Sequence, residues 1–275
     1  MIESAHIEIA PPRRWPQIHI RDLWAYRELG YFLVWRDLKV RYRQTALGIA
    51  WAVLQPTVTV LIFTIIFSRL ARLPSEGVPY PVFALAALLP WQLFSTAVTA
   101  SSNSLVGNAN LLTKVYFPRL IVPIGAVLST LADFLISSLL LAMLMTWYHI
   151  VPGAGVVLLP LFILQALLLA LGIGLWASAL NVRYRDVQYA MPFAMQILLF
   201  LSPVAYSAAL VPTGRWQVFY ALNPLVGTIQ AFRWALLGAD PPWPFIVPSG
   251  IVTVVLLIGG LMFFARMENS FADVV

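Results

Sequence analysis

Few residues of this sequence could do chemistry, and the most conspicuous is one aspartate inside a long apolar stretch. Asp133 shares a helical face with Ser129, Thr130 and Ser137. A carboxylate in such a stretch is costly and usually faces protein or water. The polar stripe therefore predicts a hydrogen bond from Asp133 to a neighbouring helix, and its alternatives are a wet cavity or protonation during transport.

Two other helical faces place an aromatic ring beside polar groups. Trp51 shares a face with Gln55, and Trp91 shares one with Ser95 and Thr99. Tryptophan in an apolar run usually packs or marks the membrane boundary. A ring beside hydroxyl and amide groups also suits a sugar, whose C–H faces stack on rings. The candidate channel or substrate residues are Trp51, Gln55, Trp91, Phe94, Ser95 and Asp133.

No cluster of residues supports catalysis or metal binding. The only two lysines, Lys39 and Lys114, do not follow a glycine-rich phosphate loop. The paired carboxylates of a proton-coupled transporter or a glycosyltransferase are absent from the apolar runs. There is no cysteine, and His6, His19 and His149 are scattered. We expect a chain that is not an enzyme and holds no cofactor.

Composition defines the elements that must position these residues. With 61% hydrophobic and 10% charged residues over 275 positions, the chain is predicted to be an all-α polytopic membrane protein. The net charge of +6 does not indicate nucleic-acid binding, because the basic residues do not gather on one soluble module. Runs of about 20 apolar residues predict six spans, at 47–68, 78–100, 120–148, 156–180, 190–208 and 245–265.

The basic residues predict the orientation of these spans. All but four of the 17 lysines and arginines fall in the N-terminal segment, the second and fourth loops and the tail. The positive-inside rule then places both termini in the cytoplasm. The predicted parts are an N-terminal extension (1–20), an amphipathic helix (21–46), a six-span domain (47–265) and a cytoplasmic tail (266–275).

The segment 209–244 is too apolar for an ordinary aqueous loop. Its apolar runs are short and divided by prolines, which is typical of helices that re-enter a membrane or lie at its surface. We expect two short helices in the outer leaflet. The alternative is a seventh crossing over 225–238.

The stretch before the first span predicts a helix at the membrane surface. Tyr31, Val34, Trp35, Leu38 and Tyr42 form its apolar face by helical spacing. Arg36, Lys39 and Arg43 fall on another face. This basic face could be an anchor on anionic lipid or a contact with a protein partner.

The chain resembles a known family, the type-2 ABC exporter permeases that move O-antigen, capsule and teichoic-acid polymers. The resemblance extends from about Arg36 to Phe264. It rests on Arg36-Asp37-Leu38-Lys39-Val40-Arg41-Tyr42-Arg43-Gln44-Thr45, on Leu89-Pro90-Trp91, on Asn108 to Arg119, on Asn181-Val182-Arg183-Tyr184-Arg185-Asp186, and on Leu201-Ser202-Pro203-Val204-Ala205-Tyr206 with Asn223-Pro224.

This resemblance implies a role for each motif. The amphipathic helix would lie beside a separate ATPase subunit, the loop 102–117 would be a coupling helix, and the fourth loop a second contact. The implied coupling residues are Arg36, Asp37, Lys39, Arg41, Arg43, Asn108, Lys114, Arg183, Arg185 and Asp186. The short helices after the fifth span would gate a channel between two permease copies, with Pro203, Tyr206, Asn223 and Pro224 at the outer gate.

The resulting prediction is a permease of the bacterial inner membrane that exports a lipid-linked polysaccharide. Its expected partners are a second copy of itself and two copies of an ATPase that binds ATP and Mg²⁺. The first alternative is an ABC exporter of a drug or lipid. A secondary transporter would need a coupling-ion site and probably a repeat, and a membrane glycosyltransferase would need paired carboxylates.

Overall fold

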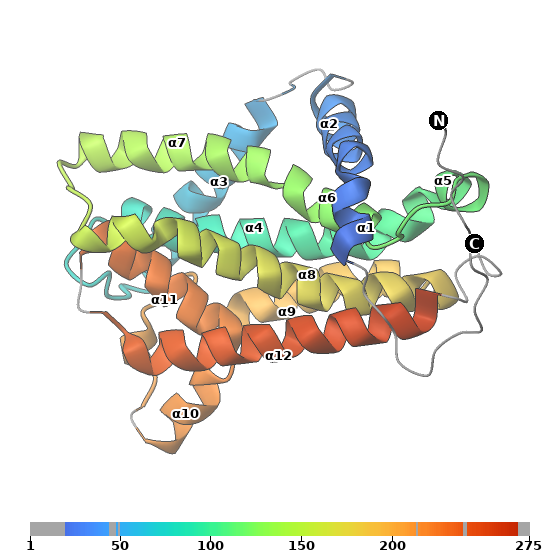
Figure 1. Ribbon diagram of the computed structural model, residues 1–275. Coiled ribbons are helices and arrows are strands. Elements are labelled where there is room, and N and C mark those ends of the chain that lie inside the picture. The colour runs from blue at the N-terminus through green and yellow to red at the C-terminus, as the bar shows by residue number, and fades with distance from the viewer. Residues whose placement is uncertain (1–19, 44–47, 49, 213, 239–240, 269–275) are drawn as a thin grey trace.

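The computed structural model describes residues 20–43, 48, 50–212, 214–238 and 241–268. The predicted N-terminal extension lies outside the described residues except for Ile20, as do most of the tail and residues 44–47. The described residues form helices and connecting turns (Figure 1). Their bounds are α1 (Ile20–Ala25), α2 (Arg27–Arg43), α3 (Ala50–Phe63), η1 (Thr64–Leu70), α4 (Tyr80–Gly107), α5 (Ala109–Lys114), α6 (Ile121–Ser129), α7 (Leu131–Trp147), η2 (Ala154–Leu158), α8 (Leu159–Arg183), α9 (Val187–Leu201), η3 (Ala208–Leu210), α10 (Arg215–Ala221), α11 (Pro224–Leu237) and α12 (Trp243–Met267).

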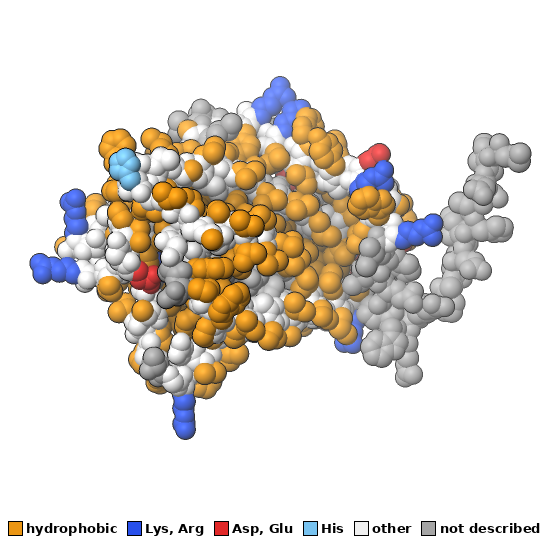
Figure 2. Space-filling view, turned by 60° about the vertical axis from the view of Figure 1, so that its left-hand side comes forward, with side chains coloured by type: hydrophobic (Ala, Val, Ile, Leu, Met, Phe, Trp, Pro, Cys, Tyr) orange, Lys and Arg blue, Asp and Glu red, His pale blue; other side chains and the backbone are white. Residues whose placement is uncertain are grey.

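Five helical stretches among the described residues are long and apolar enough to cross a bilayer. They are Ala50–Leu70, Tyr80–Gly107, Ile121–Trp147, Ala154–Arg183 and Trp243–Met267. Each matches a predicted span, and the all-helical membrane fold is confirmed. Figure 2 shows the consequence on one face, where hydrophobic side chains form a broad band and Lys and Arg lie towards its margins.

The predicted span at 190–208 is shorter than expected. Helix α9 has 15 residues and ends at Leu201, because Ser202 and Pro203 begin a turn. At 1.5 Å per residue it measures roughly 22 Å, less than the ~30 Å of a hydrocarbon core. Helix α11, the alternative seventh crossing, has only 14 residues.

Helix α4 is the centre of the bundle. It contacts α3, α6, α7, α8, α9 and α11. In its most apolar 18-residue stretch 78% of residues are buried, against 11% in Ala50–Leu70. The main core therefore surrounds α4, and α3 packs only loosely at its side.

Helix α8 packs closely against two neighbouring helices at Gly172 and Gly174, in the fourth predicted span. A Cβ on Gly172 would lie 2.8 Å from the backbone nitrogen of Leu257 in α12. One on Gly174 would lie 2.5 Å from Oγ of Ser101 in α4. Side chains at these positions would force α8 away from both neighbours.

Helix α2 runs across the direction of the long helices (Figure 1). It packs on α6, with Leu33 buried at the contact. The predicted apolar face is not the packed face, because Tyr31 and Trp35 are 73% and 46% exposed. Those two rings remain free to contact lipid.

Candidate functional site

A cavity with several polar groups in a largely apolar wall lies between α2, α3, α4 and α7. Its volume is about 270 Å³. It combines one indole ring with amide, hydroxyl, carboxylate and guanidinium groups. Its lining residues are Arg41, Tyr42, Gly48, Trp51, Ala52, Gln55, Pro56, Leu89, Gln92, Leu93, Thr96, Thr130, Asp133, Phe134 and Ser137. We call it the α2 cavity.

The cavity brings together residues from two separate sequence predictions. Trp51, Gln55 and Asp133 were predicted to line a channel, and all three lie in its wall. Arg41 was predicted to contact an ATPase, yet the structure pairs it with Asp133. Its guanidinium therefore does not belong to the freely exposed basic face of α2.

The carboxylate of Asp133 is held by two residues of α2. Arg41 donates to one carboxylate oxygen and the hydroxyl of Tyr42 donates to the other. The Arg41 and Asp133 side chains are 35% and 29% exposed, so the pair is partly solvated. Burial, and then the hydrogen bond to Asp133, raise the pKa of Tyr42 well above its ordinary value. The hydroxyl therefore stays protonated and able to donate at neutral pH.

This arrangement confirms the hydrogen bond from Asp133 to a neighbouring helix, which is α2. Asp133 also lines the α2 cavity. Ser137 donates to the carbonyl of Ala52 in α3 at 3.2 Å. The stripe thus connects α7 to both α2 and α3.

Two polar residues of the cavity were not found from the sequence. Gln92 and Thr96 lie four residues apart on α4 and both line the cavity. Their spacing places them on one helical face, and this was the available signal. The neighbouring face, with Trp91, carries a ring beside hydroxyl groups, whereas the Gln92 face has none of the rings that suit a sugar.

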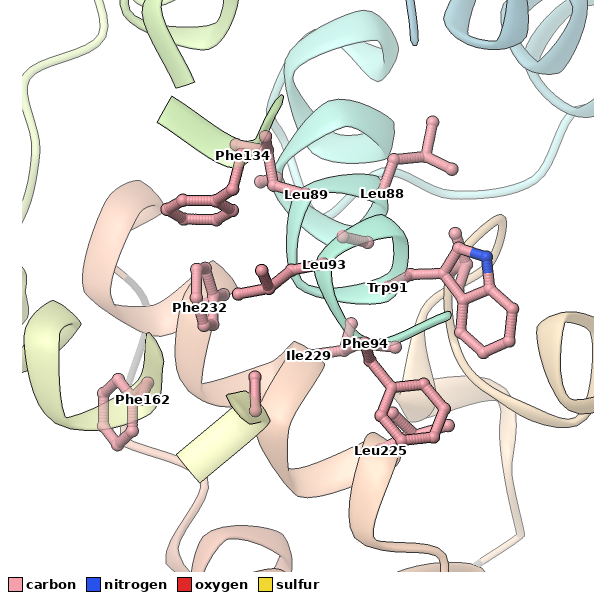
Figure 3. Close-up of a cluster of buried hydrophobic side chains, with 14 of the residues drawn as sticks. Leu88, Leu89, Trp91, Leu93, Phe94, Phe134, Phe162, Leu225, Ile229 and Phe232 are labelled. Carbon is pink, nitrogen blue, oxygen red and sulfur yellow. The ribbon is translucent and has the colours of Figure 1, made fainter. Parts of the chain in front are cut away.

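The structure does not place Trp91 and Phe94 on an open surface. They are 6% and 0% exposed, and their ring centroids are 6.0 Å apart. Figure 3 shows Phe94 near Leu225, on the side of α4 away from Phe134. Because α4 is the central helix, this face is covered by the bundle. Neither ring lines the α2 cavity, and the predicted lumen role of both rings stays a prediction.

Ser95 does not reach the α2 cavity either. Its hydroxyl donates to the backbone carbonyl of Gln92 at 3.3 Å. Such a bond satisfies the hydroxyl within its own helix. Its predicted channel role has no support from this geometry.

Away from this cavity, the four residues of the predicted outer gate lie close together. Asn223 caps α11, since its side-chain oxygen accepts from the nitrogen of Leu225 at 3.1 Å, and Pro224 follows in the first turn. The amide nitrogen of Asn223 donates to Oγ of Ser202 at 3.2 Å. This links α11 to the loop of residues 202–207, which contains buried Pro203.

Tyr206, in the same loop, is bonded to α10. The Tyr220 hydroxyl donates to the Tyr206 hydroxyl at 3.0 Å. Burial, and then this hydrogen bond, raise the pKa of Tyr220 well above its ordinary value. The 202–207 loop is therefore attached to α10 as well as to α11.

Arg233 is the residue of this region that sequence reasoning missed. It is 2% exposed and donates to the carbonyl oxygens of Val204 at 3.0 Å and Tyr206 at 3.1 Å. Its guanidinium lies 3.6 Å from the ring centroid of Phe83. A single arginine inside the apolar run 225–237 was the signal, but it was counted only as a charge on the outer side.

The remaining predicted coupling residues lie at the end of the bundle that carries α5. Figure 1 shows α5, the junction of α8 with α9 and the end of α12 at this end. Lys114, Arg183, Arg185 and Asp186 are exposed there. Asn108 instead donates from its side chain to the carbonyl of Ser104 at 2.7 Å, which satisfies the end of α4.

On α2, the other predicted coupling residues form a partly exposed charged surface. Arg36 donates to the carboxylate of Asp37 at 2.7 Å. The Lys39 ammonium lies 4.4 Å from the ring centroid of Trp35, and Arg43 is exposed. These charges are accessible to a partner.

The long apolar helices and the transverse α2 define a polytopic membrane protein. The family model described as ABC-2 type transporter matches residues 28–237, and the chain belongs to this family. It is 31% identical over 261 residues to the O-antigen export system permease protein RfbA of Myxococcus xanthus, covering 92% of this chain and 98% of the relative.

Two other relatives have similar coverage. An O-antigen export system permease protein RfbA of Klebsiella pneumoniae is 26% identical, over 87% of this chain and 92% of the relative. The polysialic acid transport protein KpsM of Escherichia coli is 26% identical, over 86% of this chain and 92% of the relative. The similarity thus includes nearly the whole length of each relative.

Proposed function

We propose that this chain is the transmembrane permease subunit of an ABC transporter that exports a lipid-linked polysaccharide, an O-antigen or a similar polymer, across the bacterial inner membrane. Family membership and the relatives' names support this proposal. The structural observation that carries it is the α2 cavity, because Trp51 offers a ring beside the amides of Gln55 and Gln92. A sugar needs such stacking and hydrogen-bonding groups together.

ATP would be hydrolysed by a separate subunit in two copies, and two permease copies would enclose the channel. The exposed charges of α2, α5 and the α8–α9 junction would meet the ATPase, and both termini would lie in the cytoplasm. Because Arg41 and Tyr42 bind Asp133, displacement of α2 by the ATPase would act directly on the cavity wall. The 202–207 loop with Pro203, Tyr206, Asn223 and Pro224 would form the outer gate.

The experiment is complementation of a strain that lacks this permease. Cells with Trp51→Ala should carry several-fold less surface polysaccharide and accumulate lipid-linked polymer inside, since losing one stacking face removes on the order of 1 kcal/mol. Permease abundance should not change, because Trp51 is 52% exposed. Trp147→Ala, which removes a 76% exposed ring outside the cavity, is the matched control.

Normal surface polymer in Trp51→Ala cells would remove Trp51 from the sugar contact. Normal surface polymer in cells lacking the permease altogether would refute the function.

A second candidate is the export of a drug or lipid. A 25% identical relative, covering 78% of this chain, carries the name inner membrane transport permease YadH, which specifies no sugar. This candidate predicts that the deletion leaves surface polysaccharide intact and alters drug resistance or lipid composition. The same strain therefore separates the two functions.

A further inference from the structure

An apolar groove separate from the α2 cavity lies where the first half of α2 crosses α6. Its volume is about 550 Å³. Two glycines, Gly30 of α2 and Gly125 of α6, form part of its lining. A Cβ on Gly125 would lie 3.4 Å from Cβ of Leu33 and 3.9 Å from the carbonyl oxygen of Gly30. The helices thus approach closely beside the groove, and we call this hollow the α2–α6 groove.

The walls of this groove are almost entirely hydrocarbon. Val34, Ile124 and Leu128 contribute aliphatic side chains and Tyr31 contributes a ring. A peptide strand in this groove would leave its backbone polar groups without partners, at a cost of several kcal/mol each. A hydrocarbon chain has no such groups. The lining therefore favours a lipid chain over a polypeptide strand.

Among the described residues that line the groove, Arg27 is the one that carries a charge. Its Nη1 donates to the carbonyl of Trp24 at 3.2 Å, and its guanidinium lies 5.5 Å from the Trp24 ring centroid. These contacts hold the cation beside the groove while the side chain stays exposed. No acidic residue is among the described lining residues. An apolar groove with a cationic side chain beside it complements an anionic amphiphile.

The surrounding surface places the groove at a membrane boundary. Trp24 and Tyr31 are 72% and 73% exposed. Exposed aromatic side chains of this kind gather where hydrocarbon meets water. The groove is thus within reach of phospholipid in the leaflet that contacts α2.

We propose that the α2–α6 groove binds one acyl chain of an anionic membrane phospholipid whose phosphate pairs with Arg27. The bound lipid would contact α2 and α6 together and so hold α2 at its angle to the bundle. The proposal does not depend on which polymer the transporter exports. The α2–α6 groove differs from the α2 cavity in both chemistry and location, because the cavity is lined by Arg41 and Tyr42 from the other end of α2.

Photo-crosslinking tests the proposal on the full-length permease. The protein is reconstituted in vesicles of phosphatidylcholine that contain a minority of phosphatidylglycerol, with a diazirine on an acyl chain of one lipid or the other. Mass spectrometry then identifies labelled peptides. We expect phosphatidylglycerol to label segments 27–34 and 121–131 several-fold more than phosphatidylcholine does.

Two variants with matched controls separate binding of the acyl chain from binding of the lipid headgroup. Leu128→Trp should fill the groove and abolish this labelling, whereas Leu135→Trp, at a 62% exposed position outside the lining, should not. Arg27→Gln should retain labelling but lower the preference for phosphatidylglycerol by about fivefold, the ratio that ~1 kcal/mol per basic residue predicts. Arg21→Gln, an equal charge change outside the lining, should leave the preference intact.

Equal labelling by both lipids in the unaltered protein would overturn the proposal. Labelling that survives Leu128→Trp, in protein with normal gel-filtration behaviour, would also overturn it. A third arm adds polyprenyl phosphate as competitor. If it displaces phosphatidylglycerol at equal concentration, the groove belongs to a carrier lipid and the proposal of a phospholipid is wrong.

Discussion

Two regions of this molecule use arginine in opposite ways. At the α2 cavity, Arg41 is partly solvated and pairs with the carboxylate of Asp133. At the 202–207 loop, Arg233 is buried and donates to the backbone carbonyls of Val204 and Tyr206. A partly solvated ion pair contributes little to stability, whereas a buried charge that loses its acceptors is strongly destabilising.

The surrounding packing follows the same division. The stretch Ala50–Leu70, which contains α3 beside the cavity, has 11% of its most apolar 18 residues buried. Most of α11, which carries Arg233, is buried. Low contact density is typical of elements that move, and high density of elements that unfold last. The comparison indicates a movable wall at the cavity and a fixed support for the 202–207 loop.

The largest predicted effect is at Arg233. Arg233→Met should lower the free energy of unfolding by about 3 kcal/mol, because two buried carbonyl groups lose a charged donor. Unfolding of the purified protein by a denaturing detergent measures the change. Arg215→Met, at an exposed arginine of α10, should change it by less than about 0.5 kcal/mol. If the two variants are equally stable, Arg233 does not act as a fixed support for the 202–207 loop.

This prediction could not come from the sequence alone. Arg233 was visible as a charge in an apolar run, but its acceptors lie 29 and 27 residues earlier in the chain. The residues that neighbour Arg233 in the sequence do not specify such a long-range contact. The same holds for Asp133, whose partners Tyr42 and Arg41 are 91 and 92 residues away.

Element lengths, by contrast, were predictable because they follow from local composition. Apolar runs of sufficient length gave five of the spans, and Ser202-Pro203 explains where α9 ends earlier than expected. Which face of α4 lies in the core was not predictable. Its Trp91 and Gln92 faces both carry hydroxyl-bearing residues. Only packing by the neighbouring helices decides that Trp91 lies in the core and that Gln92 lines a cavity.

A smaller effect is expected where α11 meets α12. A Cβ on Gly227 would lie 2.2 Å from the carbonyl oxygen of Phe245, so Gly227→Ala should cost roughly 1–3 kcal/mol through overpacking. Gly250→Ala in α12 is the control, because no heavy atom of the described residues, apart from its own stretch of helix, lies within 4 Å of its added Cβ. The same detergent titration measures both. If the Gly227→Ala protein is as stable as the control, the packing of α11 against α12 is not the rigid support inferred for the 202–207 loop.

The smallest effect on stability is expected at the α2 cavity, and a double-mutant cycle of Arg41→Gln and Asp133→Asn measures it. Because both side chains are about one-third exposed, their coupling in the free energy of unfolding should be at most about 1 kcal/mol, decreasing with added salt.

Each single variant should nevertheless reduce polymer export far more than permease abundance, since α2 would no longer be tied to the cavity wall formed by α7. Leu139→Asn, at a 71% exposed position of α7 outside the cavity lining, controls for added polarity in this helix. A coupling of several kcal/mol, as large as the Arg233 effect, would contradict a movable wall; export that merely follows abundance would assign the pair to folding.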